Sequence, residues 1–305
     1  MEAPSLKMMP TPDPLELDDS TIDELPKTPE AQTWDAALVD NVRKFNPVAR
    51  STCHRITPHL VVKSAWYGDE FDAMAYVREN TRIPVPQPRC PHLRKWLVMD
   101  FVEGSMLLNC WESQSFWMKL RIACTLRGYV KQLRRLKGTR PGSVSDGLID
   151  SHTLFDDQDL GPFTGARHFQ VWAERIAHSG WVRCIQYRRL AQIKREEAPY
   201  PIMGGDQWSL VYTHGDLNLS NIILSKDNVL WIVDRASGGF FPPWLETIGV
   251  KFSEPSISFA RFIPFIYGSY PRYEDFWVCQ RRSVNFDGPQ MSRRHHSIEL
   301  YASHR

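Results

Sequence analysis

The segment THGDLNLSNIIL, at 213–224, places a histidine, an aspartate and two asparagines between two apolar stretches. A second carboxylate, Asp234, follows at the end of the apolar run VLWIVD, thirteen residues after Asn221. Carboxylate and amide oxygens are ligands that a hard cation such as Mg²⁺ takes, and an aspartate can accept a proton from a hydroxyl group. These residue types therefore favour chemistry on a hydroxyl group beside a divalent cation.

The spacing of the polar residues within this segment favours one class of reaction, phosphoryl transfer. His214, Asp216, Leu217 and Asn221 match H-x-D-L-x-x-x-N, the spacing of the catalytic loop of phosphoryl-transferring kinases. Phosphoryl transfer needs positioning and charge neutralisation more than covalent help. Asp216 would then orient the acceptor hydroxyl and accept its proton, while Asn221 and Asp234 would bind Mg²⁺. The alternative is an Asx-rich turn between two strands of a hairpin, with His214 a hydrogen-bonded core residue.

The amino-terminal half offers a second pair of charged residues. A predicted strand, HLVVK, ends on Lys63, and a predicted helix over 69–80 follows it. Glu70 and Glu79 point to opposite faces of that helix at ~100° per residue, and Glu70 shares its face with the apolar Met74. We therefore expect an ion pair between Lys63 and Glu70. Taken singly, Lys63 is more commonly a strand-end cation, and Glu70 more commonly a partner of the helix dipole, than a member of a catalytic pair.

Hydrophobic periodicity predicts the elements that position these residues. The proline-rich block IPVPQP must stop the helix at 80, because proline cannot continue it. Apolar strands on both sides of the polar segment would hold its acidic groups on a rigid floor. Strands are predicted at 60–63 and 96–102 and in SLVYT, NIILS and VLWIVD, and helices at 34–45, 69–80, 114–136, 168–183 and 244–248.

Composition excludes several classes of protein. The chain has 305 residues, of which 42% are hydrophobic, and a formal net charge of +2, so its overall charge demands neither nucleic acid nor an anionic membrane as partner. The six cysteines form no C-x-x-C pair, which argues against a zinc site or a disulfide framework and favours a reducing compartment. Without a secretory signal or an apolar run of ~18 residues, a cytoplasmic protein with no membrane span is expected.

Taken together, these residues resemble the aminoglycoside phosphotransferase and choline kinase-like family over about 46–276. The resemblance is clearest in HGDLNLSNIIL, IVDRASGGFFPPWLE and ENTRIPVPQP, and the segment GPFTGARHFQVW is similar to fungal-type members. It implies an α+β, two-lobed protein-kinase-like fold. A small mixed amino-terminal lobe would span 34–103 and a larger, mostly helical carboxyl-terminal lobe 104–280. A disordered acidic, proline-rich tail at 1–33 and a basic tail at 281–305 would flank them.

The resemblance also implies an activity and its cofactors. The family's adenine-binding hinge corresponds to MDFVEG, so Met99 would line the nucleotide pocket while Asp100 and Val102 contact adenine through their backbones. Backbone amides around Ser51 would cap the phosphates, and Lys63 would pair with the α and β phosphates. The implied function is an ATP- and Mg²⁺-dependent phosphotransferase that acts on a hydroxyl of a small molecule, with no nucleic acid as partner.

Two departures from the family pattern motivate an alternative function without catalytic turnover. Arg235 stands where many relatives carry an aromatic residue, and it would contact phosphate, pair locally with an acid or weaken the metal site. The expected nucleotide loop, between Asn46 and His59, contains no glycine. The alternative is a pseudokinase or nucleotide-binding scaffold that keeps the fold without turnover. The acceptor stays open, because acids, aromatics and arginines occur together in 144–200 and 240–276, and so does the oligomeric state.

Overall fold

The computed structural model describes residues 17–27, 29, 31–32, 53–64, 69–93, 95–149, 160–190, 208–253 and 256–278. These residues fall into two compact units, and the division lies inside one helix, α3 (Asp69–Asn80). Unit 1 takes Met1–Phe71 and Pro86–Glu103, and unit 2 takes Asp72–Val85 and Gly104–Arg305. The segment 72–85 thus belongs with the larger unit, whereas the sequence placed it in the amino-terminal lobe. The helix predicted at 34–45 lies outside the described residues.

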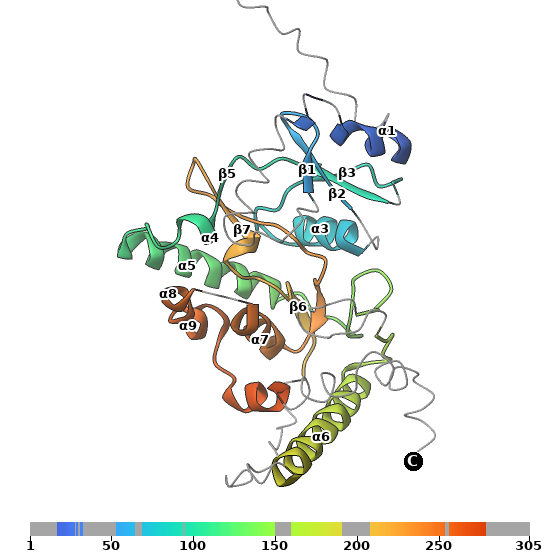
Figure 1. Cartoon of the computed structure of the whole chain (residues 1–305), viewed down its shortest axis with the longest axis vertical. Helices are drawn as coiled ribbons and strands as arrows, with labels where there is room; N and C mark the ends of the chain where they lie inside the picture. The colour runs from blue at the N-terminus through green and yellow to red at the C-terminus, as the bar shows by residue number, and fades with distance from the viewer. Residues whose placement is uncertain are drawn as a thin grey trace, which may run out of the picture. The chain divides into compact units, whose positions relative to one another are not determined.

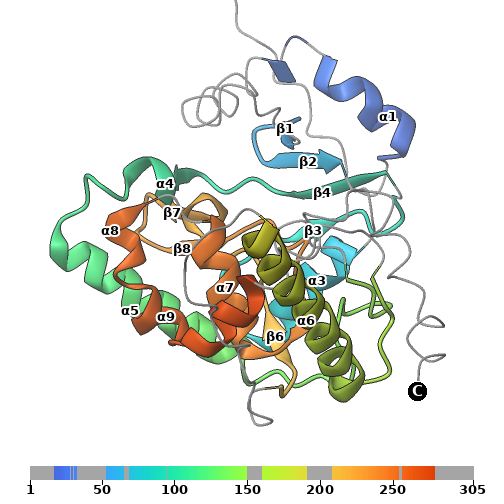
Figure 2. The same ribbon diagram turned by 60° about the horizontal axis from the view of Figure 1, so that its bottom comes forward.

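Unit 1 is built on an antiparallel sheet of four strands in the order β1-β2-β4-β3 (Figure 2). The side chains of β2 alternate, so that Leu60 and Val62 point into an apolar cluster while Val61 and Lys63 lie on the opposite face. The register pairs Lys63 with Leu97. The strands are β1 (Cys53–Arg55), β2 (Leu60–Ser64), β3 (Pro88–Arg89) and β4 (Trp96–Asp100).

A short helix, α1 (Asp19–Glu24), covers one face of this sheet and continues into the turn η2 (Leu25–Lys27). Leu17 is 2% exposed and Ile22 is 0% exposed, and both pack in the cluster that contains Leu60, Val62 and Val98. The indole of Trp96 donates to Asp23 at 2.8 Å. The prediction of a disordered tail is therefore wrong for these residues, because Leu17 and Ile22 bury their apolar side chains against the sheet. Residues 1–16 and 33–52 lie outside the described residues.

Unit 2 combines helices with two small antiparallel sheets (Figures 1 and 2). One sheet has the order β5-β7-β8 and the other pairs β6 with β9. Residues 271–278 are also helical. The elements are α4 (Leu107–Cys110), α5 (Phe116–Leu133), α6 (Ala166–Leu190), α7 (Pro243–Ser253), α8 (Ile257–Ala260), α9 (Ile263–Tyr267), η4 (Leu219–Asn221), β5 (Gly104–Met106), β6 (Val211–Thr213), β7 (Ile222–Ser225), β8 (Leu230–Ile232) and β9 (Gly239–Phe241).

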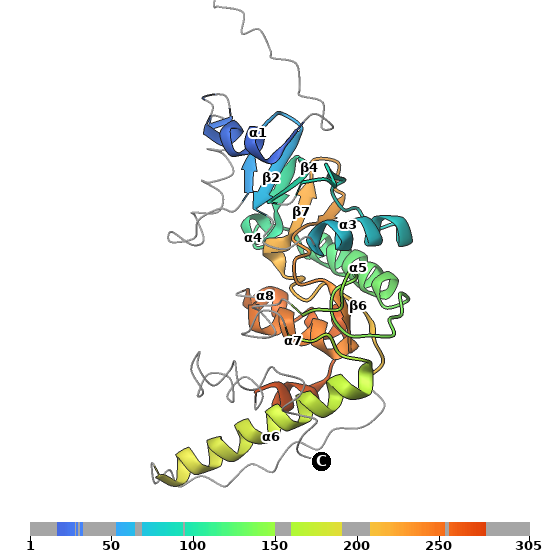
Figure 3. The ribbon, with the colours of Figure 1, turned by 90° about the vertical axis from the view of Figure 1, so that its right-hand side faces the viewer.

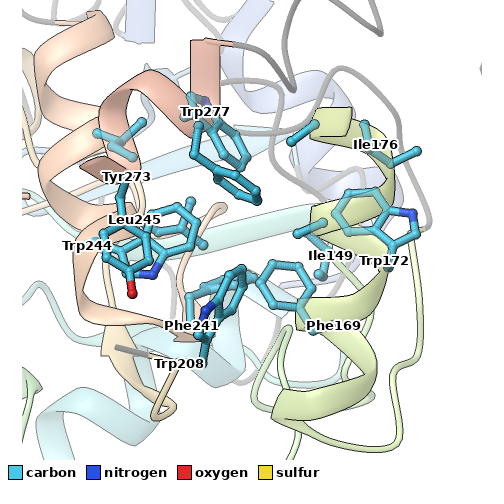
Figure 4. Packing of buried hydrophobic residues seen from close by; sticks show 14 of the residues in the cluster. Ile149, Phe169, Trp172, Ile176, Trp208, Phe241, Trp244, Leu245, Tyr273 and Trp277 are labelled. Carbon is cyan, nitrogen blue, oxygen red and sulfur yellow. The ribbon is translucent and has the colours of Figure 1, made fainter. Parts of the chain in front are cut away.

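The core of unit 2 is unusually aromatic (Figure 4). The rings of Trp208 and Trp244 meet edge to face at 5.3 Å, and Trp244 stacks on Tyr273 at 4.8 Å. Such pairs add to the free energy of burial because the positive edge of one ring meets the negative face of another. This cluster packs α6, α7 and 271–278 against the sheet of β6 and β9, and so supports the loop that follows β6.

The predicted α+β class is confirmed, with a smaller unit of mixed composition and a larger, mostly helical one. The long helix predicted at 114–136 corresponds to α5, and the helix predicted at 168–183 is the middle of the longer α6 (Figure 3). Within the described parts of the chain, no helix is both long and apolar enough to span a bilayer.

Candidate active site

The polar segment forms a tight loop between β6 and η4. Strand β6 ends at Thr213, which pairs with Gly239 of β9. Gly215 follows with φ +82°, and a Cβ atom at this position would lie 2.6 Å from the carbonyl oxygen of Ser237. Only glycine accepts both the left-handed backbone and the close approach of another main chain. The chain therefore turns sharply here and directs Asp216 out of the strand.

His214 holds this loop from inside the protein and is 0% exposed. Its Nδ1 accepts the backbone N–H of Asp216 at 3.3 Å, and its Nε2 lies 3.0 Å from the carbonyl oxygen of Val233. Because a backbone N–H can only donate and a carbonyl can only accept, the ring must be neutral with its proton on Nε2. His214 is thus a hydrogen-bonded core residue, as the alternative interpretation expected, and it ties the Asp216 loop to the chain just before Asp234.

Asp216 is held by amide groups from its own loop. Asn218 Nδ2 donates to Oδ1 at 2.9 Å, and Asn221 Nδ2 donates to Oδ2 at 3.0 Å. Burial raises the pKa of Asp216 and the charge of Asp234 raises it further, while hydrogen bonds from Ser253, Asn221 and Asn218 act in the opposite direction. A fixed, partly buried carboxylate with a raised pKa is a suitable proton acceptor.

Asn221 and Asp234 lie at the same end of the hairpin formed by β7 and β8. Ile222 pairs with Ile232, and the N–H of Val233 donates to the carbonyl oxygen of Asn221 at 3.0 Å. The hairpin register therefore places Asn221, just before β7, beside the residues just after β8. Asp234 has φ +59°, a conformation uncommon for a residue other than glycine, and its side chain is exposed.

The side chains at this end of the hairpin carry oxygen atoms of the kind that Mg²⁺ takes. Asn221 Nδ2 donates to Asp216 Oδ2 at 3.0 Å, so its Oδ1 is oriented as an acceptor, and this oxygen accepts from Ser220 Oγ at 3.4 Å. Among the described residues, no group of three or more histidine, cysteine, aspartate or glutamate side chains could hold a metal ion.

Arg235 follows Asp234 but turns into the protein and is 0% exposed. Its charge acts on Glu246 and on Tyr212, both of which are buried. Glu246, at the start of α7, accepts the backbone N–H of His214 through Oε2 at 2.5 Å. The structure therefore places Arg235 as a buried charge that acts on an acid, Glu246, and on Tyr212.

Burial sets the pKa of two groups around Arg235. It raises the pKa of Glu246 to about 7, although the N–H of His214 and the charges of Arg134 and Arg235 act in the opposite direction. Burial also raises the pKa of Tyr212, against the lowering effect of Arg235. These groups form a buried polar cluster directly beneath the Asp216 loop.

Unit 1 contains the predicted ion pair. Lys63 Nζ lies 2.8 Å from Glu70 Oε2, and the two side chains are 13% and 6% exposed. Lys63 comes from β2 and Glu70 from the first turn of α3. Glu79 is exposed on the other side of the helix, as its angular position predicted. The buried ion pair holds the lysine side chain in one orientation.

The predicted hinge is strand β4 and the residues after it. Met99 is 6% exposed, and Val102 is half-buried. The N–H of Asp100 donates to the carbonyl oxygen of Gln87 at 3.0 Å, so this N–H is already used within the protein. The Asp100 carboxylate pairs with Arg89 Nε at 2.8 Å. Ser51 lies outside the described residues, as does the first half of the predicted nucleotide loop, and the second half contains β1.

Sequence reasoning missed two residues that position the loop from far along the chain. Ser253, at the end of α7, accepts from Asn218 Nδ2 at 3.0 Å. Tyr267, at the end of α9, donates its hydroxyl to the carbonyl oxygen of Leu217 at 2.7 Å. Neither residue lies in a motif, so only the packing of α7 and α9 could show these contacts.

No protein-family model matches the chain, and no curated protein matches its sequence. Several solved structures are similar to it. They include aminoglycoside phosphotransferase APH(2'')-Ib with ADP bound (12% identity, TM-score 0.45, covering 87% of this chain and 91% of that chain). A second is a macrolide 2'-phosphotransferase from Brachybacterium faecium (12% identity, TM-score 0.43, covering 86% of this chain and 98% of that chain). A third is spectinomycin phosphotransferase APH(9)-Ia with ADP and spectinomycin (11% identity, TM-score 0.42, covering 83% of this chain and 84% of that chain). At these low values the site residues themselves must carry a functional assignment.

Proposed function

We propose that this protein is an ATP- and Mg²⁺-dependent phosphotransferase that moves the γ-phosphate of ATP to a hydroxyl of a small molecule. The observation that carries the proposal is the hydrogen bonding and pKa of Asp216. Its carboxylate accepts hydrogen bonds from Asn218 and Asn221, and the nearby charge of Asp234 raises its pKa. The sequence resemblance to the aminoglycoside phosphotransferase and choline kinase-like family, including its fungal-type members, supports the same reaction.

Each residue of the cluster has a role in this reaction. Asp216 orients the acceptor hydroxyl and takes its proton while the acceptor oxygen bonds to the γ-phosphorus and the bond to ADP breaks. Asn221 Oδ1 and the Asp234 carboxylate would hold Mg²⁺. When bound, the ion supplies charge neutralisation on the phosphate oxygens. The raised pKa of Asp216 favours its role as proton acceptor.

The nucleotide would be bound by residues of unit 1. Lys63, held by Glu70, pairs with the α and β phosphates, because its ammonium group is fixed by an ion pair of 2.8 Å. Met99 lines the adenine pocket, and Asp100 and Val102 contact adenine through their backbones. The backbone amides around Ser51 complete the phosphate contacts.

The scaffold alternative was motivated by Arg235 and by the glycine-free loop. Arg235 is buried, and its charge acts on Glu246 and Tyr212. A side chain directed into the protein supports the enzyme over the scaffold, because it does not occupy the proposed metal site. The first half of the glycine-free loop lies outside the described residues.

The test is a phosphotransfer assay on variants of the two aspartates. We expect Asp216→Ala to lower kcat by about 10²- to 10⁴-fold, the usual contribution of a general base, and Asp234→Ala to abolish Mg²⁺-dependent turnover. ATP consumption would be screened against hydroxylated metabolites, and mass spectrometry would detect the added phosphate.

Asp227→Ala is the matched control, because Asp227 is exposed in the turn at the opposite end of the same hairpin. It should turn over ATP like the parent. If folded Asp216→Ala and Asp234→Ala proteins consume ATP as fast as the parent, the assigned roles are wrong.

A further inference from the structure

The solvent face of α5 carries a row of residues that the catalytic site does not use. We call this set the basic stripe. Its members recur at intervals of three and four along the helix and the turn after it, opposite the buried face that includes Leu126 and Val130. An added Cβ at the glycine of the stripe would meet nothing within 4 Å, so the face is open there. The stripe consists of Trp117, Arg121, Cys124, Gly128, Lys131 and Arg135.

The sequence segment that carries the stripe has charge of one sign. Between Glu112 and Asp146 the chain has no acidic residue and eight lysines and arginines. Three of the eight are used by the protein itself. Lys119 pairs with Glu112 at 3.4 Å, and Arg127 and Arg134 donate to the carbonyl oxygens of Phe265 and Tyr267 at 2.7 Å and 2.5 Å.

The other five basic residues face solvent. They are Arg121, Lys131, Arg135, Lys137 and Arg140. Within the described parts of the chain, none of these five forms a salt bridge. The stripe and the turn after it therefore present positive charge that no acid of the described residues neutralises.

Large apolar side chains lie at the amino-terminal end of the stripe. Phe116 is 63% exposed and Trp117 is 75% exposed, and their rings contact each other at 5.5 Å. Ile257 of α8 is 80% exposed. Both neighbours of Ile257, Ser256 and Ser258, donate to Glu112 at 2.9 Å, so the start of α8 lies against the turn before α5 (Figures 1 and 2). An exposed apolar group of this kind marks an interaction site more often than isolated residues do.

We propose that the basic stripe and this apolar end form a surface that binds the face of an anionic lipid bilayer. Lysine and arginine side chains are attracted to anionic headgroups, and tryptophan and phenylalanine side chains favour the boundary between headgroups and acyl chains. A nucleic acid would also attract the positive charge. The aliphatic Ile257 favours lipid, because it can enter the acyl boundary but cannot stack on a base as an aromatic ring does.

This surface contains none of the residues assigned to phosphotransfer, so its test is independent of the proposed function. The full chain would be mixed with sedimentable vesicles of phosphatidylcholine alone or with about a third phosphatidylserine. We expect binding to the anionic vesicles only, and weaker binding at high salt. The double variant Arg121→Gln/Lys131→Gln should bind about 25-fold more weakly, since each basic residue near such a surface contributes about fivefold.

A control double variant, Arg167→Gln/Arg272→Gln, makes the same change in net charge at exposed positions outside the stripe. It should bind like the parent. Trp117→Ala should weaken binding about tenfold or more with an unchanged salt dependence, because burial of an apolar ring is not screened by salt.

The proposal is overturned if the parent does not sediment with anionic vesicles at low salt, or if the control variant weakens binding as much as the stripe variant. It is also overturned if the parent binds a single-stranded RNA oligonucleotide but no vesicle. Circular dichroism on each variant would establish that α5 is retained, and all substituted positions are exposed, so folding should be unaffected.

Discussion

The interior of the candidate site contains ionisable groups that chemistry on a substrate does not use. His214 and Glu246 are both buried, and the backbone N–H of His214 donates to Glu246. Within the described residues, Oε1 of Glu246 has no hydrogen-bond partner, which makes the ionised form costly. The carboxyl group at this position therefore supports the loop of Asp216 mainly as a hydrogen-bond acceptor.

The raised pKa of Glu246 predicts how stability depends on pH. Its pKa is about 7 in the folded chain, against an ordinary value of 4.5. Between these two values the folded state retains a proton that the unfolded state has released, so the free energy of unfolding falls as pH rises and levels off above about pH 7. The contribution of this group to that fall is on the order of 3 kcal/mol.

Urea denaturation at several pH values would measure this effect. The variant Glu246→Gln keeps the shape of the protonated side chain and cannot titrate, so its stability relative to the parent should increase from pH 5 to pH 8. Parallel stability curves for the parent and the variant would show that Glu246 does not titrate in this range.

At the scale of elements, the hairpin of β7 and β8 explains why Asn221 and Asp234, which are separated in sequence, lie at the same end of one element. Asn221 and Asp234 flank its two strands, and the pairing of Ile222 with Ile232 brings both to the same end. The apolar strands NIILS and VLWIVD were recognisable from sequence, so this antiparallel geometry could be predicted. The contacts from Ser253 and Tyr267 could not, because α7 and α9 reach the loop only through tertiary packing.

For helix α1, in contrast, the prediction from sequence was wrong. Composition averaged over 1–33 indicated disorder, but Ile22 lies in the core of unit 1 and Asp18 accepts the N–H of Thr21 at the helix start at 2.7 Å. A short helix depends on the surface it covers more than on its own propensity. Burial of one apolar face of α1 against the sheet is therefore sufficient to stabilise this helix.

This packing predicts a stability effect far from the site. Ile22→Ala should lower the free energy of unfolding by about 2–4 kcal/mol, because a fully buried isoleucine leaves a cavity. Ser20→Ala on the exposed side of the same helix should change it by less than about 0.5 kcal/mol. Equal, small effects of the two substitutions would mean that α1 does not pack on the sheet.

At the scale of the whole molecule, the proposed roles are shared between the two units. Unit 1 contains the ion pair of Lys63 and Glu70, and unit 2 contains Asp216, Asn221 and Asp234. Binding of a nucleotide to the folded state alone must stabilise it, whatever the acceptor is. Nucleotide binding can therefore be tested before any substrate is known.

We expect ATP with Mg²⁺, at about 100 times its dissociation constant, to stabilise the protein by about 2.7 kcal/mol, measured as a rise in Tm. Lys63→Met should abolish most of this rise, because it removes the cation assigned to the phosphates. Lys95→Met, at an exposed lysine of the same unit, should leave it intact. The absence of any shift at saturating nucleotide would favour a scaffold without nucleotide binding.

The sequence by itself determined the residues that could do chemistry and the elements that carry them. The spacing of Asp216, Asn221 and Asp234 and the angular position of Glu70 are local properties, set by the periods of strands and helices. The tertiary structure alone decided the burial of Arg235, the burial of α1 and the contacts of Ser253 and Tyr267. These depend on which apolar faces pack together over long sequence separations, and no local pattern encodes that choice.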